Sequence, residues 1–352
     1  MSLLGITVAV SLLGGCAASG MAPAGVYVVT ANGGAPGWIG APPGPPVWSL
    51  AGNKVAWGSE DGLFVAAPKA YGPRRITPRA VAGRPAWSPD GKELAYVDRD
   101  AMALTVLASD TSSVRFQVPV ANPDAPFRPI GLSFVGGPSW SPDGSRLAFT
   151  CWDGAGDEVC LIDADGSNRR QLTRLGPAPG TVPFDVTGFL PAAANTGAPV
   201  WSPDGTRLAV AALPERQGAA TGVFVIDLER AVARRISSLV PNSTLVWTPE
   251  GGAVVYSAND KGRSDAVRAP ISGGPPRKLT SMLPNGALDP ALSGDGSQLA
   301  VSSGDALVVV ASSGKTTTLP GEPGMSERAP AWDPAGDSVA FAAQPDPISR
   351  YD

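Results

Sequence analysis

The sequence predicts an all-β fold: a single seven-bladed β-propeller with four-stranded blades, whose last blade is closed by N-terminal strands. Two observations carry this prediction, namely seven copies of one short motif and a balanced count of strands at the two chain ends. The full motif reads Pro-x-Trp-Ser-Pro-Asp-Gly, as at residues 85–91, 138–144 and 199–205. Successive copies lie between 39 and 61 residues apart, which suits one blade each, with two longer gaps where loops have grown.

Each part of the motif has a structural role. Proline and glycine favour a turn, and the aspartate between them can accept hydrogen bonds from nearby amides. The tryptophan is a large apolar plate that suits packing between blades. The motif tryptophans are Trp48, Trp87, Trp140, Trp201, Trp247 and Trp332, with Leu292 in the sixth copy, and the motif aspartates are Asp90, Asp143, Asp204 and Asp295. We expect these residues to serve the architecture.

The other strands of each blade follow the motif in order. Alternating apolar segments such as 146–149 and 207–210 predict the second strand. Further apolar segments predict the third strand, at 63–65, 104–107, 159–162, 223–226, 266–268 and 307–310. Short polar segments that begin with an arginine predict a fourth, outermost strand, at 74–77, 170–173, 234–237 and 277–280. Charge at this position discourages pairing between sheet edges.

The chain ends predict how the ring closes. The last motif strand and residues 338–342 make only half a blade, whereas residues 25–34 and 38–39 read as a spare third and fourth strand. The N-terminal pair would complete the last blade and leave no open sheet edge. We therefore expect a monomeric ring over residues 25–352.

Composition restricts the function. The 352 residues include no histidine, which removes the commonest general base, the Ser-His-Asp type of triad and the favoured transition-metal ligand. The net charge of −4 and the pI near 5.0 give no basic stripe, so nucleic acid is not an expected partner.

The N-terminus reads as an export signal. Residues 3–13 are almost wholly apolar, too short to span a bilayer but suited to a signal peptide. They lead into Leu-Gly-Gly-Cys, which resembles the bacterial lipobox, so we predict a signal peptide over 1–15, lipidation of Cys16 and an anchored linker over 16–24. The alternatives are an ordinary signal peptide or a buried first strand with a coincidental cysteine, and the missing Lys or Arg before residue 3 counts against the lipobox.

Cys151 and Cys160 are the other two cysteines, in two apolar segments joined by a Gly/Asp-rich turn. In a hairpin centred near 154–156 they would face one another across the strand pair. An even pair in an exported chain favours a disulfide. The alternative is two free buried thiols.

The motif, followed by (Leu/Ile)-Ala-(Phe/Tyr/Val) and by segments like 161–173, closely resembles the TolB-type WD40-like propeller repeat over residues 25–342. The resemblance implies a relation to TolB, which works with a peptidoglycan-associated lipoprotein at the envelope, and to the propeller domains of prolyl oligopeptidase-like proteases. The chain departs from both groups, because we find no TolB N-terminal α/β domain in it and no room for a hydrolase domain.

The repeated aspartates also suggest a metal hypothesis, and residues 163–166 faintly resemble the start of a calcium loop. The further ligands of such a loop do not follow, so we predict turn capping and no metal or other cofactor. The resemblance further implies that polysaccharide lyases on similar propellers use histidine ligands, which this chain lacks. We predict no catalytic residues. The open alternatives are a carbohydrate- or lactone-active enzyme using carboxylates in the central channel, and a fragment split from a peptidase.

The two long gaps between motifs predict where binding occurs. Residues 119–137 and 175–198 precede the third and fourth motifs, and the cysteine hairpin would lie between them on the same face. Their aromatic residues, with the one at the base of the hairpin, are the candidate partner-binding residues: Phe127, Phe134, Trp152, Phe184 and Phe189. We expect this face to bind an unidentified protein or glycan of the cell envelope. The alternative is that the phenylalanines only pin the loops to the ring.

Overall fold

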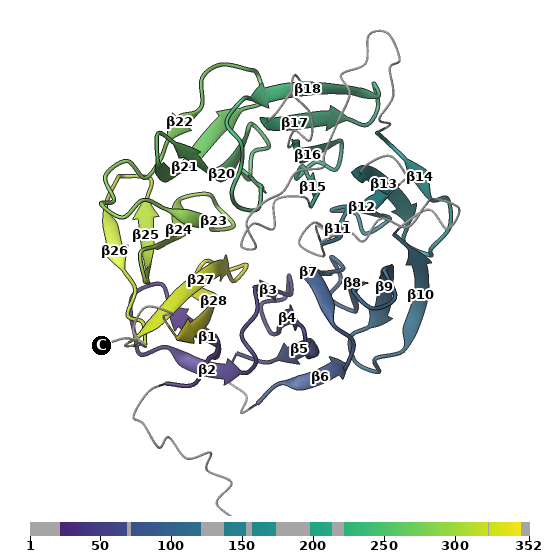
Figure 1. The fold of residues 1–352 in the computed structure, drawn as a ribbon, viewed down its shortest axis with the longest axis horizontal. Helices are drawn as coiled ribbons and strands as arrows, with labels where there is room; N and C mark the ends of the chain where they lie inside the picture. The colour runs from purple at the N-terminus through teal and green to yellow at the C-terminus, as the bar shows by residue number, and fades with distance from the viewer. Residues whose placement is uncertain are drawn as a thin grey trace, which may run out of the picture.

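The computed structural model describes residues 22–68, 72–120, 137–152, 157–173, 198–212, 222–322 and 324–345. Every regular element in these residues is a β-strand, and the strands form seven four-stranded antiparallel sheets. Figure 1 shows the sheets arranged radially around a central axis, which confirms the predicted seven-bladed propeller. In the described part of the chain, no helix is long and apolar enough to cross a membrane.

Each blade runs from an innermost first strand to an outermost fourth strand. Blades one to three contain β3 (Pro46–Trp48), β4 (Val55–Ser59), β5 (Gly62–Ala66) and β6 (Arg74–Thr77); β7 (Val81–Trp87), β8 (Glu93–Asp98), β9 (Ala103–Ala108) and β10 (Val114–Pro119); β11 (Ser139–Trp140), β12 (Arg146–Trp152), β13 (Asp157–Asp163) and β14 (Arg170–Gln171). Blades four to six contain β15 (Val200–Trp201), β16 (Arg207–Ala212), β17 (Gly222–Asp227) and β18 (Val232–Ser237); β19 (Val246–Trp247), β20 (Ala253–Asp260), β21 (Arg263–Pro270) and β22 (Arg277–Lys278); β23 (Leu288–Leu292), β24 (Gln298–Ser303), β25 (Ala306–Ala311) and β26 (Thr316–Thr318).

Blade seven joins the two ends of the chain, as predicted. Its strands are, from the centre outward, β27 (Met325–Trp332), β28 (Ser338–Pro345), β1 (Gly25–Thr30) and β2 (Gly37–Gly40). β1 pairs with β28 over six residues, from Gly25 opposite Ala343 to Thr30 opposite Ser338. The N-terminal strands thus cover what would otherwise be an open edge.

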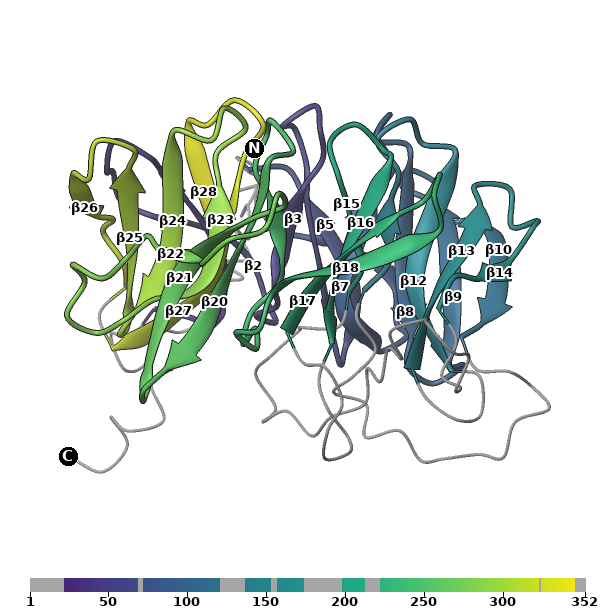
Figure 2. The same ribbon diagram turned by 90° about the horizontal axis from the view of Figure 1, so that it is seen from above.

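The antiparallel order gives the disc two different faces. First-to-second and third-to-fourth connections, which include the motif turns, lie on one face, which we call the turn face. Second-to-third hairpins and the connections between blades lie on the other, which we call the loop face. Figure 2 shows the disc from the side, with the tip of the β20–β21 hairpin at its lower edge, on the loop face.

The hydrophobic core is divided among the blade interfaces. The described residues form seven buried clusters, and each joins two neighbouring blades. One of them packs Leu104 and Val106 of blade two against Phe149 and Ile162 of blade three. Each blade is therefore stabilised by its neighbours, which is why the sheet edges and the ring closure matter.

The motif tryptophans link consecutive blades by hydrogen bonds as well as by packing. The indole Nε1–H of Trp201 donates to the carbonyl of Ser139, one residue before the tryptophan of the preceding blade, at 3.1 Å. Trp48, Trp87, Trp140, Trp247 and Trp332 repeat this bond at 2.9 to 3.3 Å. Leu292 has no indole, so the interface between blades five and six lacks the bond.

Two predicted outer strands are shorter than expected. β14 and β22 stop before Thr173 and Thr280, because each threonine hydroxyl turns into the sheet. The amide of Ala266 donates to Thr280 Oγ1 at 2.9 Å, and that hydroxyl donates to the buried Asp265 at 3.3 Å. Thr173 makes the same arrangement with Val159 and Glu158.

The basic residues on the outer strands bind neighbouring blades. Arg74 of blade one donates to the carbonyl of Asp110 in blade two at 2.7 Å. Arg234 of blade four donates to the carbonyl of Ser272 in blade five at 2.6 Å. These side chains therefore connect blades in addition to placing charge on an outer edge.

Candidate binding face

The motif aspartates accept hydrogen bonds from residues of their own turns. In blade three, Asp143 Oδ1 accepts from the Ser141 hydroxyl at 2.5 Å and from the Ser145 amide at 3.0 Å. Gly144 adopts a φ of 72°, which favours glycine. Asp90, Asp204 and Asp295 accept the same pair of bonds in their blades.

These bonds favour the charged carboxylate. The serine hydroxyl, followed by the backbone amide, lowers the pKa of Asp143 and of Asp295 to about 2, and the pKa values of Asp90 and Asp204 are lowered as well. Among the described residues, no group of three acidic or cysteine side chains is placed to hold a metal ion.

Four interruptions in the described chain open from the loop face of blades two to four. They follow the ends of β10, β12, β14 and β16, all of which are second or fourth strands. The predicted residues Phe127, Phe134, Phe184 and Phe189 fall within them, outside the described residues. Trp152 ends β12, and its side chain is likewise outside the description. Their role in binding stays a prediction.

The disulfide lies beside this region. Cys151 and Cys160 are bonded, with Cα atoms 5.8 Å apart, and both are buried in the cluster between blades two and three. The pairing is confirmed, but the predicted register is wrong. Cys151 lies opposite Glu158 and Cys160 opposite Phe149, so the disulfide joins diagonal neighbours across the strand pair.

Charged residues meet where the central channel reaches the loop face. Arg84 of β7 crosses the channel and donates from Nη2 to the carbonyl of Ala329 in β27, at 3.2 Å. Asp289 of β23 accepts from the amide of Ala329 at 3.3 Å. Arg328 donates to the carbonyl of Gly304 at 3.5 Å. We call Arg84, Asp289 and Arg328 the channel cluster.

The backbone is irregular at the level of the channel cluster. The three innermost strands β7, β23 and β27 each have a register shift at this level. Asp289 and Ala329 adopt φ values of 50° and 52°, which are uncommon outside glycine. A Cβ at Gly137 would lie 2.1 Å from the Arg84 carbonyl oxygen, so only glycine lets blade three approach here. Strained backbone of this kind often marks a functional site.

Burial shifts the pKa values of two residues of the channel cluster. Burial raises the pKa of Asp289, although Arg84, the Ala329 amide and Arg328 all act in the opposite direction. Burial also lowers the pKa of Arg84, which the carboxylate of Asp289 opposes. All three residues are nevertheless only partly buried. The cluster combines two cations with one anion, so it can attract a negatively charged or hydrogen-bonding group.

The carboxylates on the innermost strands that the structure describes are held apart. Among the innermost strands in the described ranges, Asp289 and Glu327 are the carboxylates. Glu327 is buried and accepts from the amides of Leu307 and Glu322, both at 3.1 Å, which holds it between blades six and seven. Within these described strands, Asp289 and Glu327 therefore do not form the close pair that glycoside hydrolysis ordinarily uses.

Sequence reasoning missed the channel cluster, although a signal was present. Arg84 and Asp289 both stand three residues before the motif tryptophan position, where the other copies have proline, glycine, alanine or threonine. This position carries a charge only in the copies of blades two and six, which distinguishes these two blades from the other five.

Comparisons with known proteins agree with the fold. Residues 190–350 match the TolB beta propeller domain family. Over 100 residues the chain is 35% identical to the Tol-Pal system protein TolB of Anaeromyxobacter dehalogenans. This match covers 28% of the chain and 20% of that relative, so it spans about a fifth of the relative's length.

Two solved structures share the architecture. A protein assigned as TolB from Agrobacterium tumefaciens aligns with a TM-score of 0.53 at 17% identity, over 92% of this chain and 100% of that one. An oligogalacturonate lyase from Vibrio parahaemolyticus aligns with a TM-score of 0.57 at 13% identity, over 85% and 88%. At such identities the likeness shows the fold alone.

Proposed function

Because the chain belongs to the TolB-type β-propeller family, we propose that it is a non-catalytic binding module that holds a protein of the cell envelope on its loop face. The relative in Anaeromyxobacter is named as part of a Tol-Pal system, which favours a protein partner for this chain too. We further propose that the chain works outside the cytoplasm and is anchored by a lipid on Cys16.

The observation that carries this proposal is the channel cluster. Arg84, Asp289 and Arg328 come from three blades and gather on the face from which the long segments of blades two to four also leave. These charges are partly buried in a rigid ring, so part of the free-energy cost of removing water from them is already met in the free protein. Such charges favour a polar partner. A binding role requires no further chemistry from them.

Affinity capture from membranes tests the proposal. We would compare the full-length chain with Arg84→Met, with Asp289→Asn and with a variant lacking residues 178–195. The turn-face variant Asp90→Asn, which alters the opposite face, is the matched control. We expect the loop-face variants to lose the same envelope protein that the wild type and the control retain.

Thermal unfolding of each variant separates lost binding from lost folding. If all variants are folded and capture the same partners, the loop face is not the binding face. If the wild type captures a glycan and no protein, the proposed protein partner is wrong and the partner is a glycan.

The anchor has its own test. Cys16→Ser should move the full-length protein from the membrane fraction to the soluble extracytoplasmic fraction, since one acyl-modified cysteine would be lost. Retention of this variant in membranes would contradict lipidation at Cys16.

A carbohydrate- or lactone-active enzyme is the second candidate, and Asp289 is the residue on which it depends. Turnover of an oligosaccharide or lactone by the wild type, abolished in Asp289→Asn, would favour it over the binding module.

A further inference from the structure

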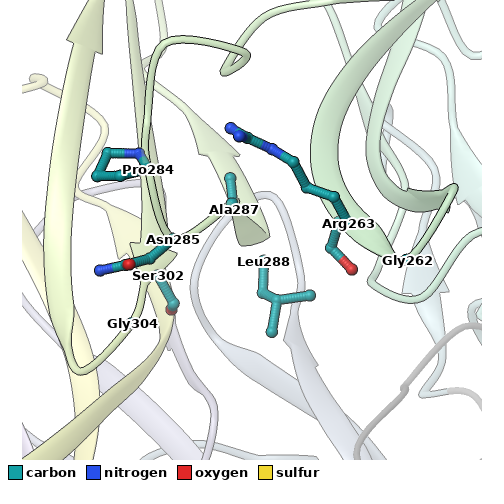
Figure 3. Close-up of a pocket in the computed structure, with 10 residues that line it drawn as sticks. Gly262, Arg263, Pro284, Asn285, Ala287, Leu288, Ser302 and Gly304 are labelled. Atoms are coloured by element: carbon teal, nitrogen blue, oxygen red, sulfur yellow. The ribbon is translucent and has the colours of Figure 1, made fainter.

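A cavity lies on the loop face, between blades five and six. It encloses about 460 Å³ and is formed by the β20–β21 hairpin on one side and the connection into β23 on the other. Figure 3 shows Arg263 on the hairpin side, with Asn285 and Ser302 across the cavity from it. We call this cavity the 5/6 cleft. Its volume lies within the range of small-molecule sites.

The two walls are fixed to one another at the base. The amide of Ala287 donates to the carbonyl of Ser264 at 2.8 Å, which joins blade six to blade five. A Cβ at Gly286 would lie 2.5 Å from that same carbonyl oxygen, and the φ of Gly286 is 72°. The cleft is therefore preformed, and glycine is needed to form it.

The charge of Arg263 is already compensated. Its Nε lies 3.3 Å from Oδ1 of the buried Asp265, and its Nη2 donates to the carbonyls of Thr280 and Ser281 at 3.3 Å each and to that of Leu283. Lys278 lies 3.2 Å from the other oxygen of Asp265. A ligand of the cleft therefore does not meet an isolated positive charge.

The uncharged polar groups of the cleft have bonding capacity left. The hydroxyl of Ser302 is buried, with 1% of the residue exposed, and has no hydrogen-bond partner. The hydroxyl of Ser264 accepts from Asn242 Nδ2 at 2.8 Å, which leaves its own proton available to donate. Asn285 is exposed at the rim and offers both a donor and an acceptor.

From these groups we propose that the 5/6 cleft binds a neutral, hydroxyl-rich ligand, namely a sugar unit of an uncharged glycan. Sugar hydroxyls both donate and accept, which matches serine hydroxyls and a carboxamide. Pro284 and Leu288 supply apolar contact for the C–H face of the ring. An unpartnered buried hydroxyl is unfavourable, so a ligand that pairs Ser302 would gain affinity. The cleft adjoins the channel cluster, because Gly304 lines the cleft and its carbonyl accepts from Arg328, but none of the three cluster side chains lines it. A sugar site here goes beyond the proposed protein partner.

Titration calorimetry on the full chain, with maltotetraose, cellotetraose and chitotetraose as probes, tests the proposal. We expect at least one neutral oligosaccharide to bind with a millimolar or lower Kd. Ser302→Ala and Asn285→Ala should each weaken that binding about fivefold, the effect of one hydrogen bond. Ser313→Ala, an exposed serine on the turn face, is the matched control and should leave the Kd unchanged.

Asn285 is exposed, so its variant tests the site even if Ser302→Ala is poorly folded. The proposal is overturned if no neutral probe binds when its concentration is raised to roughly tens of millimolar, about 20-fold above the expected Kd. It is equally overturned if only a uronic acid oligomer binds, or if both cleft variants bind as the wild type does. Arg84→Met should keep sugar binding, which separates this site from the protein-binding function.

Discussion

Asp143 illustrates how a repeated acidic residue is used within its own turn. Its carboxylate accepts from a serine hydroxyl two residues earlier and from an amide two residues later, and the same pattern recurs at Asp90, Asp204 and Asp295. All partners lie within two residues, so local sequence was sufficient to predict this role.

We expect Asp143→Ala to lower the free energy of unfolding by about 1 kcal/mol at pH 7, because one turn loses its acceptor and the site is largely exposed. The pKa of Asp143 is depressed in the folded protein to about 2. Its stabilisation is therefore fully present above about pH 4 and is lost as the pH falls from about 4 towards 2.

Urea unfolding of the wild type and of Asp143→Ala at several pH values measures this effect. The difference between the two proteins should shrink as the pH falls through that window. A difference that stays constant down to pH 2 would mean that the carboxylate charge is not responsible.

The channel cluster shows the limit of local reasoning at the same scale. Arg84 and Asp289 are more than 200 residues apart in sequence, yet both contact Ala329. Their meeting depends on β7, β23 and β27 all lining one channel, which no local pattern specifies. Only the charged residues themselves were visible in the sequence.

At the scale of elements, the motif tryptophan of each blade that has one packs against and donates a hydrogen bond to the preceding blade in the ring, next to the end of its first strand. The apolar packing of the indole was predictable from its repetition. The hydrogen bond from Nε1 was not, because its acceptor is a backbone carbonyl of another blade. Ser139 lies 62 residues before Trp201, and Ala331 lies 283 residues after Trp48.

We predict that Trp201→Phe lowers the free energy of unfolding by about 1–3 kcal/mol, since the Ser139 carbonyl loses its donor and the plate becomes smaller. Trp38→Phe is the matched control, because Trp38 lies on the outermost strand β2 and is 41% exposed. Its effect should stay within about 0.5 kcal/mol. Equal losses in the two variants would argue against the inter-blade bond as the cause.

The disulfide between β12 and β13 closes a loop with a sequence separation of 9. We expect the double variant Cys151→Ala, Cys160→Ala to lose about 2–3 kcal/mol of stability, chiefly because the unfolded chain regains freedom. The wild type unfolded in the presence of dithiothreitol should lose the same amount. If reduction leaves the wild type unchanged while the double variant is destabilised, packing and not the covalent bond explains the loss.

At the scale of the whole molecule, stability depends on closing the ring. Blade seven takes its inner two strands from the C-terminus and its outer two from the N-terminus, and Val26, Tyr27 and Val29 of β1 are almost fully buried. A ring whose core lies between blades has no independent centre, so one incomplete blade affects both neighbouring interfaces.

Removal of residues 1–44 should abolish cooperative unfolding, because β28 would lose its outer partner strand β1 and the cluster of blades six and seven would open. A circular permutant that joins Pro345 through a short linker to Ala24 and begins at Gly324 keeps all the strands. Gly25 lies opposite Ala343, so the new connection is short. We expect this permutant to unfold near the wild-type midpoint, as followed by circular dichroism.

If the truncated chain unfolds as cooperatively as the permutant, closure by the N-terminal strands is not required for stability.

The sequence by itself determined the number of blades, the use of the motif residues and the closure of blade seven, because each follows from a pattern that repeats or from a count along the chain. It also favoured a disulfide between Cys151 and Cys160, but the structure decided the bond and its register, since one residue in the turn decides which residues lie opposite. The tertiary structure alone decided the channel cluster, the indole bonds between blades and the 5/6 cleft. These depend on distances between blades, which the curvature of the closed ring sets and no single repeat contains.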